Sequence, residues 1–214
     1  MFITLEGIEG AGKSSQLENI VAFFKGRGYP CVTTREPGGT AVGAQIRGIL
    51  LDPENRDLDP RAELLLYVAD RVQHIKTVIE PHLEERRVVL CDRFFDATLV
   101  YQGYARGLDT GLIRDLHRLV CNDLTPDLTL LFDLEPRVGL ARAWRQIGNG
   151  GRTDLESRFE LEALAFHEKV RSGYLELAHS NPRRFRIIDA AQDRDAVTRD
   201  VEAALGAYVN GELS

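Results

Sequence analysis

The sequence predicts an α/β fold in which a mainly parallel sheet is flanked by helices on both faces. Short apolar runs alternate along the 214 residues with longer stretches in which apolar residues recur at every third or fourth position, the pattern of strands separated by helices. In addition, residues 7–14 directly follow the first apolar run and fit the pattern G-x-x-x-x-G-K-[ST] of a phosphate-binding loop (P-loop) at every position.

The elements are assigned in chain order from these periodicities and from the residues that interrupt them. Strands are predicted at residues 2–5, 29–34, 88–91, 128–133 and 185–189. Helices are predicted over residues 17–24, 42–49, 65–79, 109–121, 136–148, 159–177 and 197–209. Gly26 ends the first helix, and Pro136 suits the first turn of the fifth. The polar connector at 52–60 is no domain boundary, so we expect a single domain, residues 1–214.

The glycine-rich loop has the chemistry of a phosphate site. Its glycines let backbone N–H groups turn toward an anion, and the following helix adds its positive N-terminal end. Lys13 can reach the outer phosphates, and the Ser14 hydroxyl can hold Mg²⁺. An ordinary glycine-rich turn is the alternative, but the flanking strand and helix are the context that the motif requires. The expected donor-binding residues are Gly7, Ile8, Glu9, Gly10, Ala11, Gly12, Lys13, Ser14 and Ser15.

Charged residues also follow the second and third predicted strands. Arg35 and Glu36 precede a rigid turn that begins at Pro37, and Asp92 and Arg93 follow the strand at 88–91. The carboxyl ends of parallel strands are where open α/β sheets bind ligands. There Asp92 is expected to organise Mg²⁺ through water, and Arg93 to clamp a phosphate. Alone, Arg35 and Glu36 could equally form an exposed ion pair.

The helix predicted over 65–79 has two distinct faces. Its expected core stripe consists of Leu65, Val68, Val72, Ile75 and Ile79, and its second face carries Tyr67, Arg71 and His74. We expect Tyr67 and Arg71 to face a ligand. For His74 alone, a satisfied or solvated histidine is the expected role.

A mobile lid is predicted at about residues 142–158. Residues 148–151 contain three glycines, which do not favour a packed element, and Arg142, Arg145 and Arg152 lie in or next to this stretch. A solvated, disordered loop is the alternative. Ser157 and Glu160 have the spacing of a capping box, which predicts that the next helix opens there.

Composition narrows the cellular setting. A formal net charge of −6 argues against a protein whose whole surface binds nucleic acid. The three cysteines, Cys31, Cys91 and Cys121, are far apart and form no C-x-x-C pair, which favours a reduced compartment. No apolar run approaches the roughly 20 residues that cross a bilayer, and no signal peptide precedes the first strand. The sequence therefore predicts a cytoplasmic protein with neither a nucleic-acid nor a membrane partner.

The motifs together indicate phosphoryl transfer. The chain has no N-K-x-D segment of the kind that reads guanine in switch proteins, and instead carries Arg35 and Arg93 on loops at the P-loop edge of the sheet. Two phosphate sites that face each other suggest transfer from a nucleoside triphosphate to an acceptor that already bears a phosphate. The alternatives are a kinase for another nucleoside monophosphate or for a deoxynucleoside, and a non-catalytic ATP-binding switch.

These residues resemble the thymidylate kinase family over almost the whole chain. The most specific segments are residues 7–14, the segment Thr34-Arg35-Glu36-Pro37-Gly38-Gly39-Thr40, Asp92-Arg93-Phe94 and Tyr101-Gln102-Gly103. The resemblance implies a P-loop NTPase fold of the nucleoside monophosphate kinase type, with a five-stranded parallel sheet. It also implies an enzyme that transfers the γ-phosphate of ATP to dTMP, giving dTDP for dTTP synthesis, with Mg²⁺ as cofactor and a homodimer as the usual assembly.

The resemblance also implies roles at the acceptor site. Glu9 matches the carboxylate that approaches the sugar 3′-hydroxyl, and Arg35 and Arg93 match the clamps on the 5′-phosphate. Tyr67 stands where the family usually stacks a phenylalanine on thymine, and Tyr101 matches the aromatic side chain that crowds the 2′ position. The implied substrate-binding residues are Glu9, Arg35, Pro37, Tyr67, Arg71, Arg93, Thr98, Tyr101 and Gln102, with Arg71 and Thr98 on the base. The chain departs from the family pattern at Ala97, Val100 and Ser157.

The catalytic cation is expected in the lid. One branch of the family has an arginine inside the P-loop, where this chain has Ala11. In the other branch the lid supplies it, and Arg142, Arg145 and Arg152 are available here. The implied catalytic residues are Glu9, Lys13, Arg93, Arg145 and Arg152, and the implied Mg²⁺ ligands are Ser14 and Asp92.

Overall fold

In the computed structural model, which describes residues 1–148 and 157–211, five parallel strands form one sheet in the order β2-β3-β1-β4-β5. The strands are β1 (Phe2–Glu6), β2 (Cys31–Arg35), β3 (Val88–Asp92), β4 (Leu128–Asp133) and β5 (Phe185–Asp189). The inner strands β1, β3 and β4 are buried along nearly their whole length, as strands covered on both faces must be. All five strand predictions are confirmed, as is the parallel sheet implied by the resemblance.

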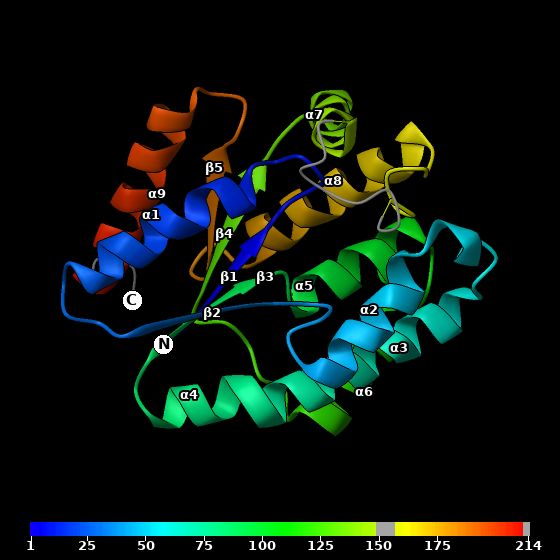
Figure 1. Cartoon of the computed structure of the whole chain (residues 1–214), viewed down its shortest axis with the longest axis horizontal. Coiled ribbons are helices and arrows are strands. Elements are labelled where there is room, and N and C mark those ends of the chain that lie inside the picture. The colour runs from blue at the N-terminus through cyan, green and yellow to red at the C-terminus, as the bar shows by residue number, and fades with distance from the viewer. Residues whose placement is uncertain (149–156, 212–214) are drawn as a thin grey trace.

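Helices cover both faces of the sheet (Figure 1). On one face lie α1 (Lys13–Lys25) and α9 (Arg194–Val209). The other face carries α2 (Ala41–Leu51), α3 (Pro60–His74), α4 (Glu80–Glu84), α5 (Phe95–Thr98), α6 (Thr110–Cys121) and α8 (Leu164–Ser180), while α7 (Pro136–Gly148) packs on α8. Short segments complete the list: a 3₁₀ turn η1 (Pro53–Asn55) and two π-helical segments, η2 (Ile75–Ile79) and η3 (Leu99–Ala105). None of the described helices is both long and apolar enough to cross a membrane.

The register of the sheet gathers three strand ends at one edge. Arg35 at the end of β2 lies opposite Asp92 at the end of β3, and Leu5 of β1 lies opposite Asp92 as well. The P-loop follows β1 directly, so it stands beside the loops that follow β2 and β3. This is the edge at which an open α/β sheet binds ligands.

The long helix on the β3 side differs from its prediction. It begins at Pro60, where the Asp59 carboxylate caps Arg61 N at 2.8 Å, and it continues through the π-helical segment η2 into α4. The predicted core stripe is wrong for Leu65 and Val72, which are 57% and 38% exposed. The polar residues Glu63, Asp70, Arg71 and His74 are buried instead. The rule that the apolar face is the buried one fails here, because this helix borders a polar cavity.

Two further segments depart from expectation. No helix is predicted over residues 96–103, yet they form α5 and η3, and π-helical turns often occur at functional sites. The helix predicted to open at Ser157 begins only at Leu164, and no side chain caps it. Residues 157–160 instead form a buried turn in which Arg158 N donates to the Leu51 carbonyl at 3.2 Å. Burial of these residues against α2 overrides the local capping preference.

The predicted lid is described only at its two ends. Residues 142–148 belong to α7, and residues 157 and 158 enter the buried turn. Residues 149–156, which include Arg152, lie outside the described residues. The lid therefore stays a prediction.

One buried ion pair ties the second half of the sheet together. Arg184, just before β5, donates through both terminal nitrogens to the Asp96 carboxylate of α5, at 2.9 Å from Nη2 to Oδ1. Its Nη1 also donates to Thr129 Oγ1 of β4 at 2.8 Å. Asp96 is 2% exposed, so each charge depends on the other for compensation.

We expect Asp96→Ala to lower the free energy of unfolding by about 3 kcal/mol, because it leaves Arg184 without its charge partner in a mostly buried site. Urea unfolding followed by circular dichroism measures the change. Asp115→Ala is the matched control, since it removes an aspartate–arginine pair, with Arg118, in which both side chains are largely exposed. Equal unfolding midpoints for the two variants would contradict this account.

Candidate active site

A cavity of about 600 Å³ opens at the carboxyl ends of β1, β2 and β3. The P-loop forms one wall, and the loop after β2, helix α3 and the segment from β3 to η3 form the others. The sequence-predicted residues that line it are Glu9, Gly10, Ala11, Gly12, Lys13, Ser14, Ser15, Arg35, Pro37, Tyr67, Arg71, Asp92, Arg93, Thr98, Tyr101 and Gln102. One cavity thus joins the expected donor and acceptor sites.

The P-loop has the backbone of an anion site. Gly10 and Gly12 have φ angles of 70° and 87°, which glycine adopts without a steric penalty, and Gly12 caps α1 without a side-chain hydrogen bond. Lys13 Nζ donates to the carbonyl oxygens of Gly7 and Ile8, each at 3.2 Å. Burial, with repulsion from Arg93, lowers the pKa of Lys13 to about 8. An anion in the loop would restore the preference of this side chain for its charged form.

Helix α7 approaches the P-loop too closely for side chains. A Cβ atom at Gly10 would lie 2.0 Å from the carbonyl oxygen of Gly139, and one at Gly139 would lie 2.5 Å from that of Glu9. Because both obstacles are backbone atoms, neither glycine can be replaced without moving the loop or the helix. The pair therefore sets the position of the P-loop relative to α7.

At the acceptor end, Glu9 stands at the centre of a charged cluster. Its Oε1 accepts from Arg93 Nη2 at 3.0 Å and from the Tyr101 hydroxyl at 2.6 Å. Burial would raise the pKa of Glu9, but the Arg93 guanidinium and His167 together hold it well below its usual range. Arg93 itself has a φ of 70°, which side-chain-bearing residues rarely adopt. Such strain is found where a functional group has to be held in place.

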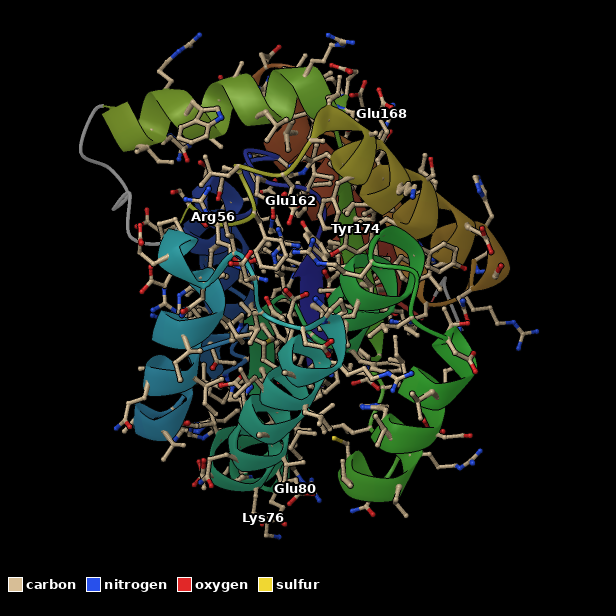
Figure 2. The ribbon with its side chains drawn as sticks, turned by 90° about the vertical axis from the view of Figure 1, so that its right-hand side faces the viewer. Arg56, Lys76, Glu80, Glu162, Glu168 and Tyr174 are labelled. Carbon is tan, nitrogen blue, oxygen red and sulfur yellow. The ribbon has the colours of Figure 1, made fainter. Side chains whose placement is uncertain are left out.

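Glu6 and Tyr174 support this cluster from the interior. Tyr174 points inward from α8, whereas Glu168 of the same helix points outward (Figure 2). The Tyr174 hydroxyl donates to Glu6 Oε2 at 2.6 Å and accepts from Arg93 Nη1 at 3.1 Å. Burial, together with the charge of Asp96, raises the pKa of Glu6 to about 7.

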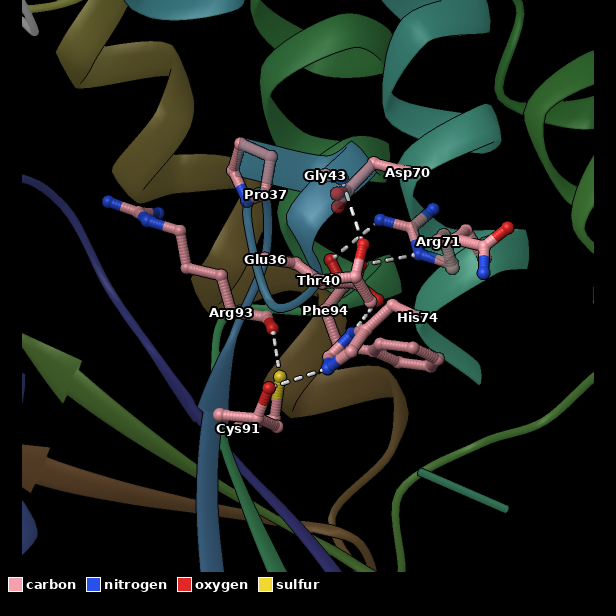
Figure 3. Close-up of polar contacts among 12 residues, drawn as sticks. Glu36, Pro37, Thr40, Gly43, Asp70, Arg71, His74, Cys91, Arg93 and Phe94 are labelled. Atoms are coloured by element: carbon pink, nitrogen blue, oxygen red, sulfur yellow. Dashed lines mark hydrogen bonds and ion pairs between the residues drawn. The ribbon is translucent and has the colours of Figure 1, made fainter. Parts of the chain in front are cut away.

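A second cluster orients Arg71 (Figure 3). Arg71 Nε donates to Glu36 Oε2 at 2.8 Å, and Nη2 donates to Thr98 Oγ1 at 2.7 Å. The other Glu36 oxygen pairs with His74 Nδ1 at 2.9 Å, and His74 Nε2 lies 2.6 Å from Thr34 Oγ1. His74 is thus a satisfied buried histidine. Within the described residues Arg71 Nη1 has no hydrogen-bond partner, so it can donate to a ligand.

The residues expected to hold Mg²⁺ fit such an ion. Ser14 and Asp92 both line the cavity, and Asp92 Oδ1 is buried without a hydrogen-bond partner among the described residues. Residues 1–148 and 157–211 contain no cluster of three or more histidine, cysteine or acidic side chains that could enclose a metal. This combination suits Mg²⁺, which keeps several waters and binds through few protein groups plus phosphates.

Some predicted site residues lie elsewhere. Gly7 and Ile8 do not line the cavity and act through their carbonyl groups on Lys13. Arg145 is exposed on α7 and does not line the cavity either, whereas its neighbour Gln146 does. Arg152 lies outside the described residues.

The structure also adds residues that the sequence analysis missed. Arg47 of α2 lines the cavity and donates from Nη1 to the Pro37 carbonyl at 3.1 Å. His167 of α8 lies 3.3 Å from Glu9 through its Nδ1 atom. No motif marks either residue, since both lie inside ordinary amphipathic helices. Tyr174 carried a signal, because it lies four residues after Val170 and three before Leu177, on an apolar stripe of the helix predicted over residues 159–177.

Comparison with known proteins identifies relatives along the whole chain. A family model described as thymidylate kinase matches residues 5–201. The thymidylate kinase of Desulfosudis oleivorans is 55% identical over 205 residues, 96% of each chain, and that of Desulfovibrio desulfuricans is 50% identical over 209 residues, 98% of this chain and 96% of the relative. The crystal structure of thymidylate kinase from Ehrlichia chaffeensis superposes with a TM-score of 0.73 at 33% identity, covering 96% of this chain and 98% of that one.

The close approach of α7 to the P-loop yields a test. We expect Gly139→Ala to weaken ATP binding by about tenfold or more, because the added methyl group would displace the Glu9 backbone. Isothermal titration calorimetry measures the affinity. Gly206→Ala is the control, since a Cβ at Gly206 in α9 meets nothing within 4 Å. Unchanged ATP affinity in the Gly139 variant would show that the contact does not set the loop.

Proposed function

The chain belongs to the thymidylate kinase family, and we propose that its cavity transfers the γ-phosphate of ATP to dTMP, giving dTDP. One observation carries the proposal for this site: the P-loop and the arginines Arg35 and Arg93 line the same cavity. An oxygen of the dTMP phosphate attacks the γ-phosphorus in line, and the bond to the β-phosphate oxygen breaks to release ADP.

We assign the donor end to the P-loop. Its backbone N–H groups and Lys13 hold the β- and γ-phosphates, and Ser14 and Asp92 would hold Mg²⁺. The ion, when bound, neutralises charge on the phosphate oxygens during transfer. Asp92 Oδ1 has no hydrogen-bond partner in the part of the chain that the structure describes, and burial lowers the pKa of Lys13. Both observations support these roles, because a cation beside Asp92 and an anion beside Lys13 would each favour the charged form of the side chain.

The acceptor end takes the nucleotide by its three parts. Arg35 and Arg93 bind the phosphate, Glu9 accepts from the sugar 3′-hydroxyl, and Tyr101 crowds the 2′ position. Tyr67 stacks on the base, with Pro37 and Gln102 completing the wall. Arg71 and Thr98 read the base edge. Nη1 of Arg71, which has no hydrogen-bond partner among the described residues, supports this role, since a donor-only group suits the O4 carbonyl of thymine.

The lid supplies the catalytic cation in this proposal. Ala11 leaves the P-loop without an arginine, and α7 carries Arg145 toward the start of the lid, with Arg152 further along the chain. A cation that arrives as the lid closes would stabilise the transferring phosphoryl group more than bound dTMP.

We also propose a cytoplasmic homodimer. Large apolar side chains are exposed on three neighbouring helices, α2, α3 and α6, and they are Val42, Ile49, Leu65, Val72, Leu112, Leu119 and Val120. A patch of this kind is typical of a protein–protein interface. The free thiols of all three cysteines agree with a reducing compartment.

Lys13 provides a direct test of the donor site. Lys13→Ala is expected to leave the fold intact and to lower turnover by more than about tenfold, since a cation at the transferred phosphate is lost. A coupled assay of ADP release measures it. Lys25→Ala, at the exposed far end of the same helix, should match the unmodified enzyme. Full activity of the Lys13 variant would refute the P-loop assignment.

The acceptor preference should run dTMP, then dUMP, then dCMP. Loss of the thymine methyl costs dUMP about 1 kcal/mol of apolar contact, whereas the cytosine amine would face the Arg71 donors and cost roughly 1–3 kcal/mol or more. Steady-state kcat/KM values for a panel of monophosphates measure the order.

Arg71→Ala should lower the ratio of kcat/KM for dTMP to kcat/KM for dCMP. The main effect should be slower reaction of dTMP, because the variant no longer offers a hydrogen-bond donor to O4. An unchanged ratio, or a purine monophosphate preferred by the unmodified enzyme, would overturn the proposed base pocket.

A further inference from the structure

Behind the acceptor end of the cavity, two buried polar atoms face each other. Glu9 Oε2 and His167 Nδ1 lie 3.3 Å apart, and neither makes a hydrogen bond within the described residues. His167 is fully buried and Glu9 is 9% exposed at its side chain. Buried polar groups are nearly always satisfied, so a facing pair of this kind calls for an explanation.

The orientation of the His167 ring is fixed from its other side. Nε2 lies 3.0 Å from the Phe159 carbonyl oxygen, which can only accept, so Nε2 carries a hydrogen. Nδ1 then points at a carboxylate oxygen, which also accepts. Both ring nitrogens therefore face hydrogen-bond acceptors.

The two oxygens of Glu9 have different surroundings. Oε1 is occupied by Arg93 and Tyr101, whereas Oε2 has only His167 beside it among the described residues. Glu9 lines the cavity, whereas its Oε2 atom is buried on the side of the imidazole, so His167 can fix the rotation of the carboxylate from behind. Without the imidazole, nothing described would hold the carboxylate in this rotation from the Oε2 side.

The ring is anchored to a rigid part of the molecule. Phe159 belongs to the buried turn at 157–160, and its neighbour Arg158 forms an ion pair of 2.6 Å with Glu63 of α3, with side chains 3% and 0% exposed. His167 therefore connects a fixed turn to the P-loop carboxylate.

We propose that His167 is a positioning residue that fixes the rotation of the Glu9 carboxylate, so that Glu9 can accept a hydrogen bond from the 3′-hydroxyl of the acceptor. It does not line the cavity, so it acts through Glu9 and not on the substrate. This inference rests on the proposed function, in which Glu9 accepts from that hydroxyl.

Two substitutions distinguish the contribution of His167 Nδ1 from that of Nε2. The asparagine amide in His167→Asn stands near the place of Nδ1 and can still donate to Glu9, whereas the glutamine amide in His167→Gln reaches the place of Nε2 and can donate only to Phe159. We expect His167→Gln to lower kcat/KM for dTMP by about tenfold, the loss typical of a hydrogen bond to a charged group. His167→Asn should recover most of it.

The second readout is an acceptor that lacks only the 3′-hydroxyl, 2′,3′-dideoxythymidine monophosphate. The unmodified enzyme and both His167 variants should phosphorylate it at similar rates, because Glu9 has no hydroxyl to accept from. His167 would have only a structural role if its variants lost kcat/KM equally for both acceptors. The same conclusion would follow if kcat/KM for dTMP were no higher in His167→Asn than in His167→Gln.

His117→Gln is the matched control. His117 is likewise buried, its Nε2 lies 2.9 Å from the Leu124 carbonyl oxygen, and its Nδ1 has no hydrogen-bond partner among the described residues. Unlike His167, it forms no ion pair with a carboxylate of those residues. The His117→Gln substitution should leave kcat/KM unchanged for both acceptors. A loss of kcat/KM for dTMP alone in this variant would overturn the assignment to His167.

Failure of this inference can be told from failure of the proposed function. If the Glu9→Gln variant keeps the ratio of kcat/KM for dTMP to kcat/KM for the dideoxy analogue that the unmodified enzyme has, the proposed role of Glu9 is wrong, and the inference about His167 is wrong as well. If Glu9→Gln loses the preference for dTMP and His167→Gln keeps it, only the inference is wrong.

Nitrogen NMR of the unmodified protein tests the same contact without a variant that has to fold. The Nδ1 resonance of His167 should move on adding dTMP and stay in place on adding the dideoxy analogue. An identical response to both acceptors would overturn the proposal.

Discussion

A guanidinium removed from water needs a carboxylate beside it, and this requirement organises the cavity and the elements around it. Arg93 is paired with Glu9, Arg71 with Glu36 and Arg158 with Glu63. These carboxylates come from the P-loop, from the loop after β2 and from the start of α3. Loss of one partner would strand a buried charge, so each pair fixes the relative position of two elements. The arginines are therefore in place before any nucleotide arrives, and little reorganisation accompanies the reaction.

The apolar part of the fold gives these pairs their frame. The buried strands β1 and β3 bring the P-loop and Arg93 to the same edge of the sheet, while Gly10 and Gly139 allow α7 to rest directly on the loop backbone. Backbone contact with α7 thus positions the P-loop, and ion pairs position Arg71 and Arg93. The sheet carries both.

Most of the fold could be predicted from local patterns. All five strands are apolar runs, and the P-loop is specified by its own glycines, lysine and serine. The exceptions share one cause. The stripe through Leu65 and Val72 faces outward because the opposite face of α3 carries the residues that satisfy Glu36, and Ser157 does not cap a helix because its turn is buried against α2. In each case a tertiary contact outweighs a local preference, which for a helix N-cap is about 1 kcal/mol.

By itself the sequence determined the succession of strands and helices along the chain, the P-loop, and which charged side chains lie at the ends of β2 and β3. These features depend on residues close together in the chain, so periodicity and motif spacing are sufficient to find them. Only the tertiary structure decided that Arg71 pairs with Glu36, that Arg47 lines the cavity and that His167 faces Glu9. Such contacts join residues far apart in the chain, and which charge meets which depends on strand order and helix rotation, neither of which a local pattern contains.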